Sequence, residues 1–397
     1  MMAPGPLAGT RVADLSRVLA GPYCSMLLAD MGAEVIKVEP PDGDDTRAWG
    51  PPFIEGQSAY FLSINRGKRS VVLDLKSEEG KALLWRLLER CDVLLENFRP
   101  GAMDRLGFGV AAVASRLPRL VYCSISGFGH TGPDHALPGY DVLVQGESGL
   151  MSLTGEESGP AYKLGVSISD LTAGMMACQA ILAALLHRER TGEGQHLDVA
   201  MLDVSASLLT FQAGIYFATG KAPRRRGNAH PTIAPYSTYE CADGTLIVAV
   251  GNDNLFQRFC QAIELPDLAS DDRFALAAAR VENRVALDEL LVPVLRGKGR
   301  DAWIAQLRRL GVPCGAVRDL AEVCESPHLR ARGMLQEMEH PRAGRIRQLG
   351  PAATLSRSPW SLQRPPPLLG EHSDEILREL GLDAAEVMRL RAARVVF

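Results

Sequence analysis

The feature that most constrains this sequence is a strand–helix–strand pattern in its first forty residues. Arg11–Leu15 and Glu34–Glu39 predict two buried strands. Between them, Gly21–Met31 predicts a helix that ends at Gly32. Two strands joined through a helix run parallel, and parallel sheets carry helices on both faces. We therefore expect an α/β fold.

The same alternation continues along the chain. Further strands are predicted at Ser70–Leu75, Val93–Glu96 and Leu120–Ser124, with an amphipathic helix at Glu78–Arg90. This pattern predicts a Rossmann-like, doubly wound parallel sheet, in which ligands bind at the carboxyl ends of the strands.

The second half of the chain differs in pattern. Leu171–Arg190 predicts a long helix, and the basic stretch Lys221–Gly227 is typical of a linker. Tyr236–Cys241 and Thr245–Val250 flank Asp243-Gly244, the turn of a β-hairpin, and helical patterns follow. Because 397 residues exceed what one core usually organises, we expect a large domain and a smaller α+β domain.

Charge and cysteine content exclude several classes of protein. The net charge of −4, from 43 basic and 47 acidic residues, gives no field that would attract nucleic acid or an anionic membrane. The eight cysteines form no C-x-x-C pair, so neither a zinc site nor a disulfide framework is indicated. We see no secretory leader and no stretch of about 20 apolar residues that would span a bilayer. We therefore expect a cytoplasmic protein without a metal.

Asp170 supports two interpretations. It follows Gly165-Val166-Ser167-Ile168-Ser169 at the start of the predicted long helix, where an aspartate is commonly an N-cap. The same position stabilises negative charge, so the carboxylate can also serve as an ionised nucleophile. The pattern alone leaves both interpretations open.

Other motifs argue against common enzyme classes. The turn after the first strand, Ser16–Pro22, lacks two glycines of G-x-G-x-x-G, so a nicotinamide dehydrogenase is weakly supported even with Glu39 at the ribose-binding position. The absence of G-x-S-x-G disfavours a Ser-His-Asp hydrolase. Basic residues at Lys68-Arg69, Arg99 and Arg105 gather where a parallel sheet binds phosphates.

Taken together, motifs along the whole chain resemble the class III CoA-transferases, the family of formyl-CoA transferase, carnitine CoA-transferase and the α-methylacyl-CoA racemases. The matching segments are residues 15–22, 28–39, 96–101 (Glu-Asn-Phe-Arg-Pro-Gly), 127–133, 191–195 and 367–372. Within the family, residues 43–53 and 337–341 most resemble the dicarboxylate branch of the succinyl-CoA:glutarate type.

The resemblance implies a fold and a site. It implies a CoA-binding Rossmann-like domain over residues 1–225, a small domain over 226–325, a tail over 326–397 that returns to the large domain, and an interlocked homodimer. Asp170 matches the nucleophilic aspartate of the family. Coenzyme A enters as substrate, in an acyl-CoA donor, and no permanently bound cofactor is implied. The positions that match CoA contacts are Val18, Leu19, Lys68, Asn97, Phe98 and Arg105.

The sequence departs from the family pattern at three places. Leu19 replaces a glutamine of formyl-CoA transferase, which argues against a formyl or oxalate substrate. Pro40 replaces an arginine, and Gly227-Asn228-Ala229-His230 replaces a polyglycine loop.

Tyr140 favours CoA transfer over racemisation. Racemases of the family carry histidine in a Gly-His-Asp segment, where this chain has Gly139-Tyr140-Asp141. A phenol, with an ordinary pKa near ~10, accepts a proton at neutral pH less readily than an imidazole does. Tyr140 is equally well a packed aromatic or a substrate contact, and a non-catalytic CoA-binding protein is the third interpretation.

If the acceptor is a dicarboxylate, its second carboxylate needs a cationic partner, because burying it unpaired costs several kcal/mol. Arg47, within the segment shared with the dicarboxylate branch, and Arg226, at the start of the small domain, are the predicted partners. The alternatives for both side chains are a contact with a CoA phosphate or exposure to solvent, and exposure is the favoured alternative for Arg226.

Overall fold

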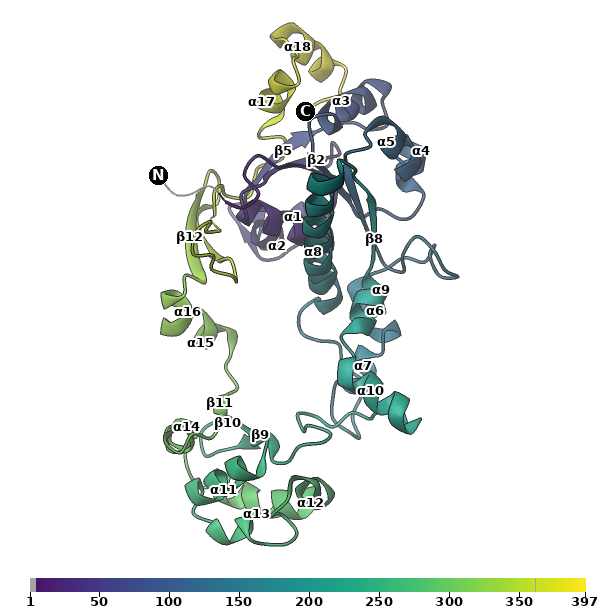
Figure 1. Ribbon diagram of the computed structural model, residues 1–397. Helices are drawn as coiled ribbons and strands as arrows, with labels where there is room; N and C mark the ends of the chain where they lie inside the picture. Colours follow the sequence, from purple (N-terminus) through teal and green to yellow (C-terminus); the bar gives the residue numbers. More distant parts are fainter. Residues whose placement is uncertain (1–4, 361) are drawn as a thin grey trace. The chain divides into compact units, whose positions relative to one another are not determined.

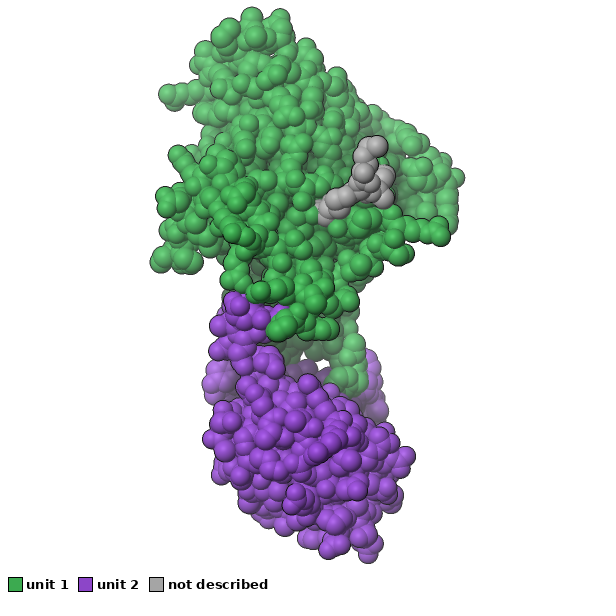
Figure 2. Space-filling model, turned by 90° about the vertical axis from the view of Figure 1, so that its left-hand side faces the viewer, with its two compact units in different colours: residues 1–150, 164–211, 327–397 green, residues 151–163, 212–326 purple. Residues whose placement is uncertain are grey.

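The computed structural model describes residues 5–360 and 362–397, and the chain divides into two compact units (Figures 1 and 2). Unit 1 comprises Met1–Leu150, Leu164–Phe211 and Pro327–Phe397, and unit 2 comprises Met151–Lys163 and Gln212–Ser326. The chain thus passes from unit 1 into unit 2 twice, at 151–163 and at 212–326, and returns to unit 1 each time.

Unit 1 is built on a parallel sheet of six strands. They are β1 (Arg11–Asp14), β2 (Glu34–Glu39), β5 (Lys68–Val72), β6 (Val93–Glu96), β7 (Val121–Ser126) and β8 (His196–Ala200). Their spatial order is β5-β2-β1-β6-β7-β8, and each neighbouring pair is parallel. This is the doubly wound order, with its switch point between β1 and β6. The predicted Rossmann-like α/β fold is confirmed.

Helices cover both faces of this sheet. One face carries α3 (Glu78–Leu88), α4 (Ala102–Leu106), α5 (Val110–Arg116), α17 (Ser373–Glu379) and α18 (Ala384–Ala392). The other carries α1 (Ala20–Asp30), α6 (Asp141–Glu147), α8 (Ile168–Thr191) and α9 (Met201–Ser207). Neighbouring strand residues such as Leu94 and Leu95 belong to opposite cores, as the two-residue period of a strand requires.

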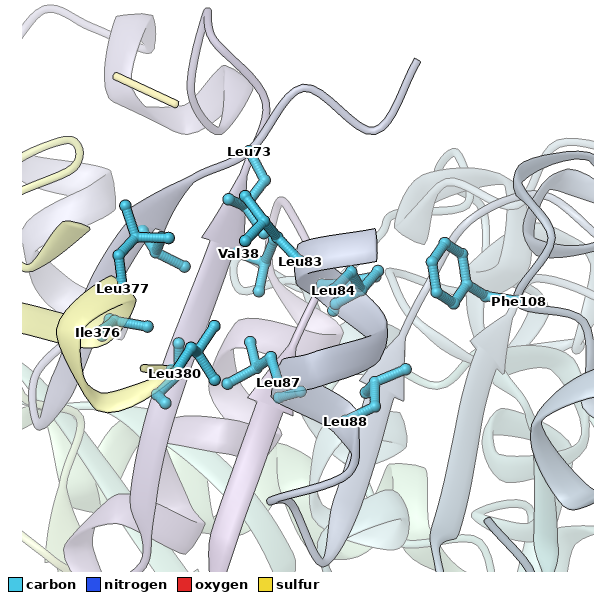
Figure 3. Packing of buried hydrophobic residues seen from close by; sticks show 14 of the residues in the cluster. Val38, Leu73, Leu83, Leu84, Leu87, Leu88, Phe108, Ile376, Leu377 and Leu380 are labelled. Atoms are coloured by element: carbon cyan, nitrogen blue, oxygen red, sulfur yellow. The ribbon is translucent and has the colours of Figure 1, made fainter. Parts of the chain in front are cut away.

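The C-terminal tail returns to the N-terminal sheet, as predicted. Ile376 and Leu377 of α17 and Leu380 just after it pack with Leu73 and Leu83 in one buried cluster (Figure 3). Polar contacts add to this packing. Arg69 of β5 forms ion pairs with Glu379 at 2.8 Å and Glu375 at 3.2 Å, so the tail completes one layer of unit 1.

The helix α8 is the longest helix described, and by length and composition alone it could cross a membrane. The expectation that no stretch is long and apolar enough is therefore wrong for α8. Its buried residues, among them Ala177 and Ile181, lie in the core beneath the sheet, as in a core helix. Met175, Met176 and Leu186 stay exposed on the protein surface.

Unit 2 has its own core, and the predicted small α+β domain is confirmed. An antiparallel sheet of order β11-β10-β9 joins Cys314–Ala316, Thr245–Ala249 and Tyr236–Glu240. Its apolar face packs with α11 (Asp253–Ala262), α13 (Arg284–Arg296) and α14 (Arg300–Arg309).

Shorter elements connect these layers. They are η1 (Asp45–Ala48), β3 (Phe53–Ile54), β4 (Gln57–Ser58), α2 (Ala59–Ile64), α7 (Leu150–Leu153), α10 (Thr210–Thr219), η2 (Pro266–Ala269), α12 (Ala277–Glu282), α15 (Leu320–Cys324) and α16 (Pro327–Ala331). A hairpin of β12 (Leu335–His340) and β13 (Gly344–Leu349) follows the return to unit 1.

Candidate active site

A pocket of about 160 Å³ opens in unit 1 at the carboxyl ends of β1, β6 and β7. Its wall includes Arg17 and Val18 after β1, Asn97 and Phe98 after β6, and Asp170 from α8. This is the switch point of the sheet, where doubly wound folds bind ligands. Sites that enclose a whole small ligand usually measure about 300–1,000 Å³, so this pocket has room for a reacting group rather than for a whole nucleotide.

The turn after β1 is fixed by hydrogen bonds to its backbone. The Asn97 side chain accepts from the Arg17 N–H at 2.9 Å and donates to the Arg17 carbonyl at 2.7 Å. Asp44 accepts from the N–H of Val18 at 3.3 Å. Val18 has φ of 69°, a strained value for a β-branched residue, so these partners hold the turn in a shape it would not adopt alone.

A buried charge cluster supports this turn from below. Lys37 donates to the Ser16 carbonyl and to Asp44, each at 2.8 Å, and Lys68 lies 3.2 Å from Asp14. Burial alone would raise the pKa of Asp14, but Lys68 and Lys37 hold it below its ordinary value. Burial, with repulsion from Lys37, lowers the pKa of Lys68 to about 8 against the attraction of Asp14. The cluster is a structural support of the site.

Two glycines form part of the pocket wall. A Cβ on Gly127 would lie 2.4 Å from the Cα of Gly139, and the reverse substitution would bring the atoms to 2.1 Å. Because such distances are far below van der Waals contact, both positions require glycine. The backbone segments after β7 and before α6 can therefore touch beside the pocket.

Asp170 lies in the first turn of α8 rather than at its N-cap position. The N-cap residue is Ser167, whose side chain makes no capping hydrogen bond, and Asp170 is the third residue of the helix. The interpretation of Asp170 as the N-cap is therefore wrong. Asp141 of α6 performs the capping instead: its Oδ1 accepts from the Ser169 N–H at 2.9 Å and from the Asp170 N–H at 3.5 Å.

The Asp170 carboxylate therefore does not cap the helix. Within residues 5–360 and 362–397, no group donates a hydrogen bond to it, and it faces the pocket that Arg17 and Arg99 also line. Burial, and then the nearby charge of Asp141, raises the pKa of Asp170 to about 7. A half-buried carboxylate of this kind is a good candidate for a nucleophile or for an acid–base group.

The structure brings together only some of the residues predicted from the sequence. Val18, Asn97, Phe98 and Tyr140 line the pocket with Asp170. Tyr140 is 61% exposed there. The described pocket wall does not include Leu19 and Lys68, which are buried, or Arg47 and the exposed Arg105. Arg226 lies in unit 2, also exposed.

Arg47 and Glu39 are partners of each other. The guanidinium of Arg47 binds both oxygens of Glu39 at 2.7 Å, donates to the Pro367 carbonyl at 3.1 Å and stacks on Phe61. Burial would raise the pKa of Glu39, but Arg47 holds it below its ordinary value. Glu39 is therefore already bound within the protein, which leaves no ribose-binding acid for the dehydrogenase interpretation.

Sequence reasoning missed Arg17 as a pocket cation, Asp44 as a partner of the turn, and Asp141 as the cap of α8. Arg17 and Asp44 stand in segments that the sequence singled out, but their contacts join residues 26 to 80 positions apart. Asp141 precedes Ser169, the residue whose N–H it binds, by 28 positions. Local capping rules search only the residues beside a helix and could not have found it.

Comparisons with known proteins show the family of the chain and agree with its fold. Residues 7–373 match the model of CoA-transferase family III. The succinate–glutarate CoA-transferase of Agrobacterium fabrum is 44% identical over 94% of this chain and 96% of its own length. The succinyl-CoA:glutarate CoA-transferase of Homo sapiens is 39% identical over 98% of this chain and 90% of its own length. The crystal structure of a CaiB/BaiF family protein from Brucella suis has a TM-score of 0.85 and 44% identity, covering 95% of this chain and all of that one.

The raised pKa of Asp170 predicts a pH-dependent cost to stability. An ionised Asp170 disfavours the folded state, and this cost is absent below pH ~4 and complete above pH ~7. Asp170→Asn removes it, so the variant should gain about 1–3 kcal/mol over the unmodified protein at pH 8 and almost nothing at pH 4.5, after allowance for partial solvation. Urea unfolding at both pH values measures this difference. The exposed Asp203→Asn is the control, and an equal gain at both pH values would contradict the assignment.

Proposed function

This chain belongs to CoA-transferase family III and is a class III CoA-transferase, and from that premise we propose that Asp170 is the nucleophile that carries CoA from an acyl-CoA donor to a free carboxylate. One observation carries the proposal. Asp141 caps α8, and the Asp170 carboxylate is left without a hydrogen-bond donor among the described residues, facing the switch-point pocket.

The proposed reaction begins at the thioester. An Asp170 oxygen attacks the carbonyl carbon, the C–S bond breaks, and CoA leaves as a thiolate with the bonding pair. The thiolate attacks the Asp170 carbonyl of the mixed anhydride, which releases the donor as a free carboxylate and leaves an aspartyl-CoA thioester. No proton is gained or lost in either step.

The second half of the reaction repeats these steps in reverse order. The acceptor carboxylate attacks the aspartyl thioester and expels the thiolate, which forms an aspartyl-acceptor anhydride. The thiolate then attacks the acceptor carbonyl of this anhydride, which gives the new acyl-CoA and regenerates the Asp170 carboxylate. Because one thioester is exchanged for another, the steps are energetically balanced and need no external energy source.

The positive charge beside Asp170 supports an anionic acceptor. Arg17 and Arg99 line the pocket, whereas Arg47 is bound to Glu39. Relatives named for succinate, succinyl-CoA and glutarate motivate a short dicarboxylate as the acceptor and succinyl-CoA as a donor. We propose that Arg99 contributes most to holding the distal carboxylate, since Arg17 also lies 3.6 Å from Asp45.

Racemisation is the weaker alternative for this site. A racemase needs a second acid–base group opposite the carboxylate. The side chain at the corresponding position is Tyr140, and no histidine lines the described pocket. These two observations favour transfer.

Asp170→Asn should lower CoA exchange by at least about 10³-fold, because an amide cannot form the anhydride. Mass spectrometry of acyl-CoA products from succinyl-CoA and glutarate measures the rate. CoA binding, followed by calorimetry, should stay within a few-fold of that of the unmodified enzyme. Asp203→Asn should keep full activity, and normal turnover by Asp170→Asn would refute the nucleophile.

The enzyme should prefer acceptors that carry a second carboxylate. Glutarate or succinate should give kcat/KM values at least about tenfold above butyrate, because only they form a charged pair with the arginine. Arg99→Met should raise the KM for glutarate much more than the KM for butyrate. Arg226→Met and Arg47→Met test the two arginines that were predicted from the sequence to bind this carboxylate. Equal use of mono- and dicarboxylates would point to an apolar acceptor pocket.

We also propose that the enzyme works as a homodimer. Each unit exposes large apolar side chains: Met175, Met176 and Leu186 on α8 in unit 1, and Tyr216 and Phe217 on α10 in unit 2. Phe217 is 81% exposed, which is unusual for an isolated soluble surface. Light scattering at micromolar concentration should give twice 42.9 kDa, and a mass of 42.9 kDa would contradict the proposal.

A further inference from the structure

The carboxylate of Asp141 connects α6 to the N-terminus of α8. Its Oδ1 accepts from the N–H groups of Ser169 and Asp170, and its Oδ2 accepts from the Gln145 amide at 2.7 Å. The Gln145 carbonyl in turn accepts from the Leu164 N–H at 2.8 Å. Gln145 is 1% exposed, so this chain of hydrogen bonds is almost wholly shielded from water. Its geometry fixes the Asp141 side chain.

Two carboxylates therefore share one helix terminus. A helix N-terminus stabilises roughly half a negative charge, which is too little for two full charges placed side by side. Asp141 accepts hydrogen bonds from the free N–H groups of the helix terminus. Asp170 is therefore stabilised only by what remains of the electrostatic field of that terminus. Both residues line the same pocket.

We propose that Asp141 is a positioning residue with two separable effects: its oxygen caps α8 and so frees the Asp170 carboxylate, and its fixed negative charge favours every state in which Asp170 is neutral. This inference deepens the proposed transfer reaction and depends on Asp170 being its nucleophile.

The second effect acts on catalysis as well as on protonation. Asp170 is neutral when it carries a proton, and it is equally neutral in the mixed anhydride and in the aspartyl-CoA thioester. A neighbouring negative charge raises the free energy of the ionised carboxylate and leaves these neutral forms nearly unaffected. The charge of Asp141 thus favours covalent capture of the acyl group and of CoA.

Other charged or titratable groups surround Asp170, and none of them replaces Asp141. Besides burial, Asp141 is the group that raises the pKa of Asp170, which reaches about 7. Tyr60 on α2 lies near both carboxylates. Burial, together with the charges of Asp170 and Asp141, raises the pKa of Tyr60 to about 12. The remaining charged or titratable groups of the pocket wall are Arg17, Asp45, Arg99 and Tyr140. The helices α1 and α9, which pack against α8, carry Tyr23 beside Gly174 and the exposed Asp203.

Substitutions can separate the cap from the charge. Asp141→Asn keeps an oxygen for the helix, since asparagine caps about as well as aspartate, and removes the charge. It also places an NH₂ group opposite the NH₂ group of Gln145. In the double variant Asp141→Asn, Gln145→Glu, the glutamate oxygens accept from the new asparagine NH₂ group and from the Leu164 N–H. The negative charge then lies on residue 145, on the side of residue 141 that faces away from α8. Asp141→Ala removes both cap and charge.

The experiment measures kcat/KM against pH and the fraction of enzyme trapped as the aspartyl-CoA adduct. For the unmodified enzyme we expect activity to rise with pH up to about 7, because the ionised Asp170 is the reactive form. In Asp141→Asn the acidic limb should move down by about one pH unit, and the adduct fraction should fall several-fold. In the double variant the acidic limb and the adduct fraction should change in the same direction by a smaller amount.

The outcomes are distinguishable. An unchanged acidic limb and adduct fraction in both charge variants, with melting temperatures close to that of the unmodified enzyme, would overturn the role of Asp141 and leave the transfer mechanism standing. Full activity of Asp170→Asn would instead refute the mechanism on which the inference depends. Loss of stability in Asp141→Ala alone supports the separate capping effect.

Discussion

The active site depends on the hydrogen bond between the Ser169 N–H and the carboxylate of Asp141. Every helix leaves its first N–H groups without an internal partner, and α8 does not satisfy them with its own N-cap residue. Asp141 supplies the missing acceptor from α6. If Asp170 made this contact, its oxygens would be held by the backbone and would be poorer nucleophiles. Because Asp141 caps α8, the Asp170 carboxylate is available for the nucleophilic role that we propose.

The sheet determines where that carboxylate can act. The strand order β5-β2-β1-β6-β7-β8 separates the loops after β1 and β6 and opens the crevice between them. Asn97 ties the two loops together, and the buried pair of Lys37 and Asp44 holds the turn around the strained Val18. These charged residues therefore hold the shape of a turn that lines the pocket, although neither Lys37 nor Asp44 is part of the described pocket wall.

Much of the fold could be predicted from the sequence, because its signals are local. The strands β2 and β6 were predicted at their observed bounds, and β1, β5 and β7 within three residues at each end, since buried strands form short apolar runs between turn residues. The strand β8 was missed because its residues His-Leu-Asp-Val-Ala mix polar and apolar types. In the site, pattern and family resemblance selected Asp170. The cap at Asp141 and the ion pairs of Lys68 and Arg47 depend on contacts between distant segments, which no local pattern encodes.

The central claim is that Asp170 becomes covalently bonded to the groups that it transfers. The most direct measurement is to mix the enzyme with succinyl-CoA, add hydroxylamine, and map the modified peptide by mass spectrometry. The account predicts a hydroxamate at Asp170, formed only when the acyl-CoA is present and absent from Asp170→Asn. A turnover-competent enzyme that yields no adduct, or an adduct at another residue, would contradict it.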